Sequence, residues 1–410
     1  MHIRPIFSAL LRNKVGLILI GLQMALTLAV VVNALYIIQQ RLVLMNEVSG
    51  VDEANLFTLS SSGFVADFDA GSVLRDDLRR IRETPGVKAA FATNALPLAG
   101  NGWASGVENR ESEPFVTATT AMYFADEQAI DTYGVNLIAG RNFTADEISD
   151  YLPESENVPT QIIITEGLAR ALFPTVESMN EIVGRQISVG DPEKHPLAQV
   201  IGIVERLRSP WRGWADIEER VTLVPYRMLN SDSSAYLIRA EPGQRDRLMR
   251  EVEAMLIASN SGRIIRSLKS FSDIRDNFYR NDGAVSILLG IVVAALLLVT
   301  GLGIVGLVSF WVSQRIKQIG TRRALGATRP NILGYFMTEN LIIGCIGAIS
   351  GSALAYLLNA LLMNQFGLSR LAWYWVPVGA LIVLLLGQIA AFGPARRASK
   401  VSPAIATRTV

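Results

Sequence analysis

The chain has 410 residues, half of them hydrophobic, with 38 basic and 37 acidic side chains. A mean hydropathy of +0.31 at this length indicates a membrane protein with a substantial soluble part. The charge is divided sharply. Residues 39–282 hold 25 Lys/Arg and 36 Asp/Glu, whereas the remainder holds 13 Lys/Arg and one acid, Glu339. Nucleic-acid binding is not expected, because the positive charge does not lie on the predicted folded domain.

The few cysteines and histidines argue against several kinds of catalytic or metal site. Cys345 is the single cysteine, so no intrachain disulfide can form. His2 and His195 lie far apart and lack companions at ligand spacing, so neither a zinc site nor a histidine-based triad is expected. No G-x-x-x-x-G-K-[ST] phosphate loop occurs. We therefore expect a non-catalytic subunit with no cofactor or metal of its own.

The N-terminal region predicts two helices. Residues 1–14 carry three cations, with apolar residues at helical spacing, which indicates a cytoplasmic interfacial helix. Residues 15–38 predict the first transmembrane helix, because this apolar run is too long for a signal-peptide core and no cleavage site follows. Gln23 and Asn33 interrupt the run, and we expect them to hydrogen-bond to neighbouring helices rather than to form a transport site.

Residues 39–282 predict a large folded domain outside the membrane. A strand–helix–strand pattern occurs near each of its ends, at Asn55–Ser60, Ser72–Thr84 and Val87–Asn94, and again at Ala235–Ala240, Gln244–Ala258 and Arg263–Leu268. Two such units suggest a single α+β lobe built from both ends of the domain. The sequence between them is richer in short strands and turns.

Three further apolar segments complete the predicted membrane part. The run within 283–312 exceeds the roughly 20 residues needed to cross a bilayer, so it predicts a stalk continuous with the second transmembrane helix. Residues 332–363 predict the third helix, and 374–393, after a short outer loop at 364–373, predict the fourth. The cations of the tail, 394–410, place it in the cytoplasm.

The third predicted helix carries a stripe of small residues that suits close helix packing. The stripe consists of Gly347, Gly351 and Ala355, at spacings of four. Small residues at this spacing let another helix approach closely. The partner helix can belong to the same subunit or to the second subunit of a dimer, and the sequence does not distinguish these alternatives.

The segment 313–331, between the second and third predicted membrane helices, is strongly basic. Its cations are Arg315, Lys317, Arg322, Arg323 and Arg329, and it contains no acid. A basic loop between two spans is retained on the cytoplasmic side, which places both termini inside and residues 39–282 outside. For a basic loop alone, this topological role is a sufficient explanation.

The local pattern of this segment predicts a helix, a tight turn and a second helix. Arg315, Gln318 and Arg322 have the spacing of one helix face. Gly326 is typical of a helix C-terminus, and Thr328 with Pro330 is typical of a helix start. We expect Glu339, shortly after the turn, to pair with a nearby arginine.

The segment resembles the cytoplasmic signature of the MacB/FtsX-type permeases of ABC transporters, whose usual form is close to ER-x-x-EIG-x-RRALGA-(T/S). Arg315, Ile319, Gly320 and the run Arg322–Thr328 match. The resemblance implies contact with a separate ATPase subunit. The implied coupling residues are Arg315, Lys317, Gln318, Ile319, Gly320, Arg322, Arg323, Ala324, Leu325, Gly326, Ala327 and Thr328. Gln314 and Gln318 replace the usual acids, which suggests pairing with a non-identical permease.

Four pieces of the outer domain resemble the MacB-type periplasmic domain. They are Tyr133–Phe143, Gln161–Pro174, Val183–Val189 and Gln199–Pro210. With the basic segment, the resemblance covers nearly the whole chain. It implies an α-helical membrane protein with four transmembrane helices and a large α+β extracytoplasmic domain, consisting of a porter-like lobe with an inserted second lobe at about 111–220.

The resemblance implies a permease subunit of an ABC-type export complex in the bacterial inner membrane. Such a subunit couples ATP hydrolysis on its partner ATPase, which binds ATP and Mg, to movement of its periplasmic domain. A drug, a peptide or another periplasmic substrate would be exported. Expected partners are the ATPase, a second permease copy or a homologous permease, membrane lipids and, for export, a membrane-fusion adaptor and an outer-membrane channel. The alternatives are an FtsX-like or peptide-sensing regulatory transmitter and a lipoprotein-releasing permease.

Overall fold

A computed structural model describes residues 14–65, 68–151, 159–190, 197–212, 217–228, 232–366 and 369–402. The chain divides into two compact units, which are described separately. The membrane unit comprises Met1–Asn46 and Asn281–Val410, and the outer unit comprises Glu47–Arg280. The interfacial helix expected over 1–14 lies outside the described residues except for Lys14, as does the end of the tail, 403–410.

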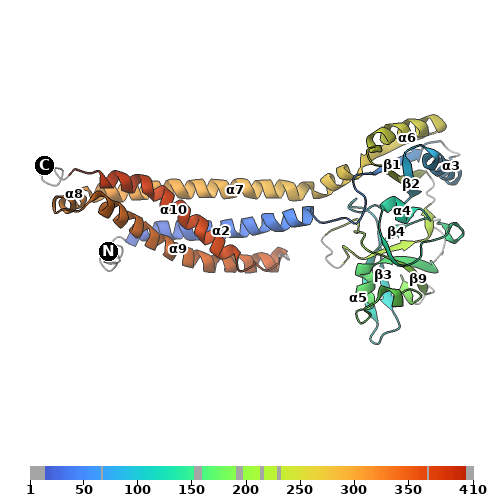
Figure 1. Ribbon diagram of the computed structural model, residues 1–410, viewed down its shortest axis with the longest axis horizontal. Helices are drawn as coiled ribbons and strands as arrows, with labels where there is room; N and C mark the ends of the chain where they lie inside the picture. The colour runs from blue at the N-terminus through green and yellow to red at the C-terminus, as the bar shows by residue number, and fades with distance from the viewer. Residues whose placement is uncertain are drawn as a thin grey trace. The chain divides into compact units, whose positions relative to one another are not determined.

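The membrane unit is helical (Figure 1). Its helices are α2 (Lys14–Met45), α7 (Phe271–Gln314), α8 (Ile316–Ala324), α9 (Arg329–Phe366) and α10 (Trp375–Ser399), and the first turns of α7 belong to the outer unit. Among the described residues, four helices are long and apolar enough to cross a membrane: α2, α7, α9 and α10. The expected four-helix membrane part is confirmed.

The small-residue stripe of α9 packs against α2 of the same chain. A Cβ added to Gly347 would lie 2.9 Å from the carbonyl oxygen of Gly21, and one added to Gly351 would lie 2.8 Å from the Cα of Ala25. Ala355, the third member, is fully buried. Because backbone atoms occupy the space next to both glycines, only residues without a side chain permit this approach. The helix that packs on the stripe therefore belongs to the same chain, which decides between the two alternatives that the sequence left open.

Polar side chains in the membrane unit hydrogen-bond between helices. Gln23 donates from Nε2 to the carbonyl of Val299 on α7, at 3.2 Å. Asn33 donates from Nδ2 to the carbonyl of Ala355 on α9, at 3.1 Å, and to Ala29 within α2, at 2.9 Å. The packing roles expected for Gln23 and Asn33 are confirmed, since each joins α2 to another helix.

The first lobe of the outer unit, which we call the porter lobe, is built from both ends of the domain. Its antiparallel sheet has the order β13-β1-β12-β2. The elements are β1 (Leu56–Gly63), α3 (Ala70–Glu83), β2 (Val87–Ala92), β12 (Ser233–Ala240), α6 (Arg245–Ser259) and β13 (Arg263–Ser270). Because strands from the two ends alternate in the sheet, the prediction of one lobe made from both is confirmed.

A buried ion pair lies inside the porter lobe. Arg263 of β13 donates to both carboxylate oxygens of Asp77 on α3, and the two side chains are 1% and 2% exposed. The hydroxyl of Tyr236 also donates to Asp77, at 2.6 Å. Around them α3 and α6 contribute apolar side chains to a common core with the strands. The carboxylate is thus desolvated and fully hydrogen-bonded.

The strands of the inserted lobe form a sheet that closes on itself. Its strands are β3 (Trp103–Asn109), β4 (Val116–Phe124), β7 (Gln161–Thr165), β8 (Gln186–Val189), β9 (Ala198–Val204) and β10 (Val221–Val224). The order is β9-β7-β10-β4-β3-β8, and β8 also pairs with β9. The sheet extends beyond the expected range 111–220, because β3 pairs along its whole length with β4.

Shorter elements decorate this lobe. They are α4 (Ala129–Tyr133), β5 (Leu137–Gly140), the 3₁₀ turns Ala145–Glu147 and Met179–Glu181, β6 (Ser149–Tyr151), α5 (Glu166–Leu172) and β11 (Tyr226–Met228). β5 extends the sheet from β9, and β6 pairs in parallel with β11. The buried faces of the strands and α5 form a separate apolar core. The expected α+β domain with an inserted lobe is therefore confirmed.

Candidate coupling segment

The basic segment forms the helix, tight turn and helix that its sequence predicts. The N–H of Gly326 donates to the carbonyl of Arg323, at 3.2 Å, and the N–H of Ala327 donates to that of Arg322, at 3.0 Å. With Gly326 at φ +98°, these two bonds make a Schellman termination of α8. The carbonyl of Thr328 then accepts from the N–H of Asn331, at 3.1 Å, which begins α9.

Arg315 occupies the break between α7 and α8 and turns toward α9. Its Nη1 donates to both oxygens of Glu339, at 2.9 and 3.0 Å. The two side chains are 18% and 3% exposed. An unpaired carboxylate at this depth would be costly, so the pair fixes the break against α9. The expected pairing of Glu339 with an arginine is confirmed.

Arg323 connects the turn to the end of α10. Its Nη1 donates to the carbonyls of Ser399 and Val401, at 2.9 and 3.1 Å. A cation near a helix C-terminus also interacts favourably with the partial negative charge there. Ile319 and Gly320 are buried on the same side of α8. Arg315, Ile319, Gly320 and Arg323 therefore form an inward-facing set that holds α8 against the bundle.

The other sequence-predicted residues form an outward-facing set, which we call the coupling surface. It consists of Lys317, Gln318, Arg322, Ala324, Leu325, Gly326 and Thr328, all exposed, with Ala327 half-buried beside them. Leu325 is 83% exposed at the turn. The guanidinium of Arg322 lies over the Tyr335 ring, 4.8 Å from its centroid.

The structure separates residues that the sequence grouped together. Gln318 and Arg322 are exposed, whereas the guanidinium of Arg315 is bound to Glu339, so the three do not present one common face to solvent. Sequence reasoning also missed the contact of Arg323 with α10. No local signal distinguishes Arg323 from the adjacent Arg322, because the difference depends on where a helix 76 residues later ends.

An exposed leucine beside cations, on a braced turn, is suited to docking on another protein. Arginine is enriched at the hot spots of protein interfaces, and the fully buried centre of an interface is more apolar than its rim. The inward-facing contacts hold the turn in place, so less conformational entropy is lost when a partner binds. A force applied to the coupling surface would pass to α9 through Arg315 and to α10 through Arg323.

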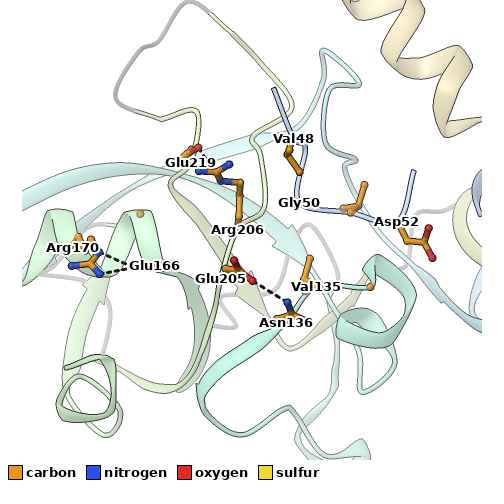
Figure 2. A pocket seen from close by; sticks show the side chains of 13 residues that line it. Val48, Gly50, Asp52, Val135, Asn136, Glu166, Arg170, Glu205, Arg206 and Glu219 are labelled. Carbon is orange, nitrogen blue, oxygen red and sulfur yellow. Dashed lines mark hydrogen bonds and ion pairs between the residues drawn. The ribbon is translucent and has the colours of Figure 1, made fainter. Parts of the chain in front are cut away.

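The outer unit contains a cleft of about 630 Å³ in which each arginine is paired with a glutamate. Figure 2 shows Glu166 bound to Arg170, at 2.6 Å, and the amide of Asn136 donating to Glu205, at 2.9 Å. Arg206 and Glu219, also on its wall, lie 3.1 Å apart. Nothing in the sequence predicts this cleft, because its walls come from five separate stretches of the chain.

Among the residues that the structure describes, no group of three or more His, Cys, Asp or Glu side chains could hold a metal ion. His2 and His195 lie outside the described residues. Cys345 is a free thiol on α9.

Comparison with protein families gives two matches that together span most of the chain. Residues 16–255 match the model of the MacB-like periplasmic core domain, and residues 290–403 match that of the FtsX-like permease C-terminal domain. The first match alone covers more than half of the sequence.

Curated relatives come from several bacteria. The macrolide export ATP-binding/permease protein MacB of Bradyrhizobium diazoefficiens is 24% identical over 344 residues, which cover 82% of this chain and 48% of that protein. The uncharacterized ABC transporter permease YknZ of Bacillus subtilis is 26% identical over 253 residues, which cover 60% of this chain and 61% of that protein. The chain thus spans about half the length of the MacB relative.

Solved structures include a similar outer domain. The crystal structure of the extracellular domain of noncanonic ABC-type transporter YknZ from Gram-positive bacteria aligns with a TM-score of 0.32 and 16% identity. The alignment covers 51% of this chain and 100% of that domain.

Proposed function

The chain belongs to the MacB/FtsX-type family of ABC transporter permeases, and we propose that it is the membrane subunit of an export complex powered by a separate ATPase. The observation that carries this proposal is the coupling surface, an exposed apolar and cationic turn fixed to two membrane helices by Arg315 and Arg323. The cofactors ATP and Mg belong to the partner ATPase, and this chain acts without catalytic residues of its own.

The proposed mechanism is mechanical transmission. Closure of the ATPase displaces the coupling surface, and the inward-facing set moves α9 and α10 with it. α7 is one helix from Phe271 to Gln314, and its first turns belong to the outer unit, so it is the natural lever between the segment and that unit. Movement of the outer unit then drives export of the cargo, which is a drug, a peptide or another periplasmic substrate.

The proposed location is the bacterial inner membrane, with both termini in the cytoplasm and the outer unit in the periplasm. The exposed cations Lys317, Arg322 and Arg329 support this orientation, because basic loops are retained on the inner side. The subunit works as a dimer, with a second copy or a homologous permease. For export across the envelope, a membrane-fusion adaptor and an outer-membrane channel complete the assembly.

The test replaces one cation and the exposed leucine of the coupling surface by acidic residues. The variant Arg322→Glu/Leu325→Asp, affinity-purified in mild detergent, should lose the ATPase that accompanies the unaltered chain. The matched control is Arg396→Glu, another exposed cation, in the last turn of α10, which should retain the ATPase. Full recovery of the ATPase with the double variant would reject the proposed docking site.

We also propose that the permease partner is a non-identical chain. The motivating observation is that Gln314 and Gln318, where the family usually has acids, are both exposed at the segment. A partner that holds the acidic residues would restore the missing charge to one half of the dimer. Native mass measurement of the purified complex tests this, and a single permease species would contradict it.

A further inference from the structure

A basic cleft lies where the two lobes of the outer unit meet. It has a volume of about 370 Å³ and is lined by Arg75, Leu78, Arg79, Arg82, Glu83 and Arg227. Three of the four arginines come from α3 of the porter lobe, and Arg227 comes from β11 beside the inserted lobe. A ligand in this cleft would therefore contact both lobes.

Two of the four arginines are amply neutralised. Arg79 lies 2.5 Å from Asp76 and 3.1 Å from Glu83, both on α3. Arg82 contacts two carboxylates of the inserted lobe, at 2.6 and 3.2 Å. Arg80 also contacts Asp76, at 2.6 Å, so Arg79 and Arg80 together face two acids, and Arg82 faces two alone. None of them leaves an excess of positive charge in the cleft.

The other two arginines share one carboxylate. Arg75 contacts Oδ2 of Asp150 and Arg227 contacts Oδ1, each at 3.3 Å. These distances exceed the roughly 2.7–2.9 Å of a strong charge-assisted hydrogen bond. Within 4 Å, two positive charges therefore face a single negative charge that binds neither of them closely. The excess positive charge of the cleft is located at this pair.

Arg227 also has an unused donor. Its Nε is buried and has no hydrogen-bond acceptor among the described residues. Buried donors are almost always satisfied in folded proteins, by protein groups, by water or by a ligand. A guanidinium presents its donors in a planar fork that matches the paired oxygens of a carboxylate or a phosphate. A guanidinium that is not fully hydrogen-bonded within the described residues and a local charge excess thus point to the same kind of ligand.

We propose that this cleft binds a small oxyanion, carrying a carboxylate or phosphate group, between the guanidiniums of Arg75 and Arg227. The ligand supplies the second negative charge that the pair lacks. Since one arginine belongs to each side of the junction, binding stabilises the contact between the lobes. The larger cleft of Figure 2 offers no comparable site, because its arginines Arg170 and Arg206 each have their own glutamate.

The test is a binding titration on the full chain in non-ionic detergent. Inorganic phosphate and citrate are titrated separately by calorimetry, at constant ionic strength set with sodium chloride. We expect saturable binding of at least one anion. Arg227→Gln should weaken it by about tenfold or more, because a hydrogen-bonded charge is lost. Arg79→Gln removes the same charge from the same cleft and should leave the affinity within about twofold, since exposed pairs contribute little.

A second variant distinguishes a loss of anion binding from a loss of folding. Arg227→Lys keeps the charge and the contact with Asp150 but removes the planar fork, so it should fold normally and still bind more weakly. Binding of phosphate alone assigns a phosphate ligand, and binding of citrate alone assigns a carboxylate ligand. Absence of saturable binding of both anions, unchanged affinity in Arg227→Gln and Arg227→Lys, or an equal loss in Arg79→Gln would each overturn the proposal.

Discussion

Along the apolar stretches of the membrane unit, the helices meet through glycines, apolar side chains and hydrogen bonds to backbone carbonyls, and guanidinium–carboxylate pairs lie near the helix ends. The outer unit instead packs two apolar cores and has many such pairs on its surface. The contrast follows from the solvent. In lipid no hydrophobic force drives one helix onto another, so shape at a few positions decides the packing. In water, apolar burial supplies most of the stability, and charged pairs mainly specify which segments meet.

The largest effect is expected where α9 meets α2. Gly351→Leu would place a side chain where the backbone of Ala25 already lies, and overpacking of this kind costs about 3 kcal/mol or more. We expect aggregation or a strongly lowered midpoint of thermal unfolding in detergent. Gly306→Leu is the matched control, because a Cβ there meets no atom within 4 Å. Normal elution and thermal unfolding of Gly351→Leu would contradict this account of the membrane unit.

The counterpart in the outer unit is the buried pair of the porter lobe. Arg263→Ala leaves Asp77 buried without its cation, which costs about 3–5 kcal/mol. The denaturant concentration at which the outer unit unfolds, monitored by its sensitivity to protease, should fall accordingly. Arg266→Ala, an exposed cation on the same strand, should have an effect of less than about 0.5 kcal/mol. Equal shifts for the two variants would show that burial does not determine how much each charge contributes to the free energy of unfolding.

An intermediate effect is expected at the pair of Arg315 and Glu339. Glu339→Gln leaves a half-buried guanidinium with a weaker acceptor, at a cost of about 1–3 kcal/mol. The ATPase should still co-purify, but stimulation of ATP hydrolysis by the permease should fall. Arg315→Gln/Glu339→Gln removes both charges and should recover part of the stability. If Glu339→Gln released the ATPase, the pair would belong to the docking site instead.

The smallest effect concerns a surface pair in the inserted lobe. The guanidinium of Arg141, with the N–H of Thr144, lowers the pKa of Glu147 from 4.5 to about 2. Since this pKa is lower in the folded state, the stabilisation is complete above pH 4.5 and is lost as pH falls toward 2. Because the pair is partly exposed, it contributes less than about 1 kcal/mol. Thermal midpoints of the unaltered chain and Glu147→Gln should differ at pH 6 and converge near pH 2; a constant difference would contradict the assignment.

Local sequence patterns predicted much of the architecture. Hydropathy indicates the four long helices, and the strand–helix–strand pattern at both ends of the domain indicates the porter lobe. Gly326 and Thr328 mark the turn of the coupling segment, because helix ends depend on residues close in sequence.

Contacts between distant residues were not predictable in this way. The orientation of Arg323 depends on where α10 ends, and the partner of the Gly347–Gly351 stripe depends on how the helices assemble. Closure of the inserted lobe depends on β8, a four-residue strand whose pairing with β9 involves only two residue pairs. A strand this short carries too little periodicity to indicate its neighbours.

That closure limits how another polypeptide can attach to the inserted lobe. Each of its six strands has hydrogen-bonded neighbours on both sides over part of its length, so these paired stretches offer an extended peptide no open row of backbone donors and acceptors. Among the described strands, β5, β6 and β11 and the outermost porter strands β2 and β13 are paired on one side only, and a peptide could continue a sheet there. Partners that bind elsewhere on the inserted lobe must recognise its side chains.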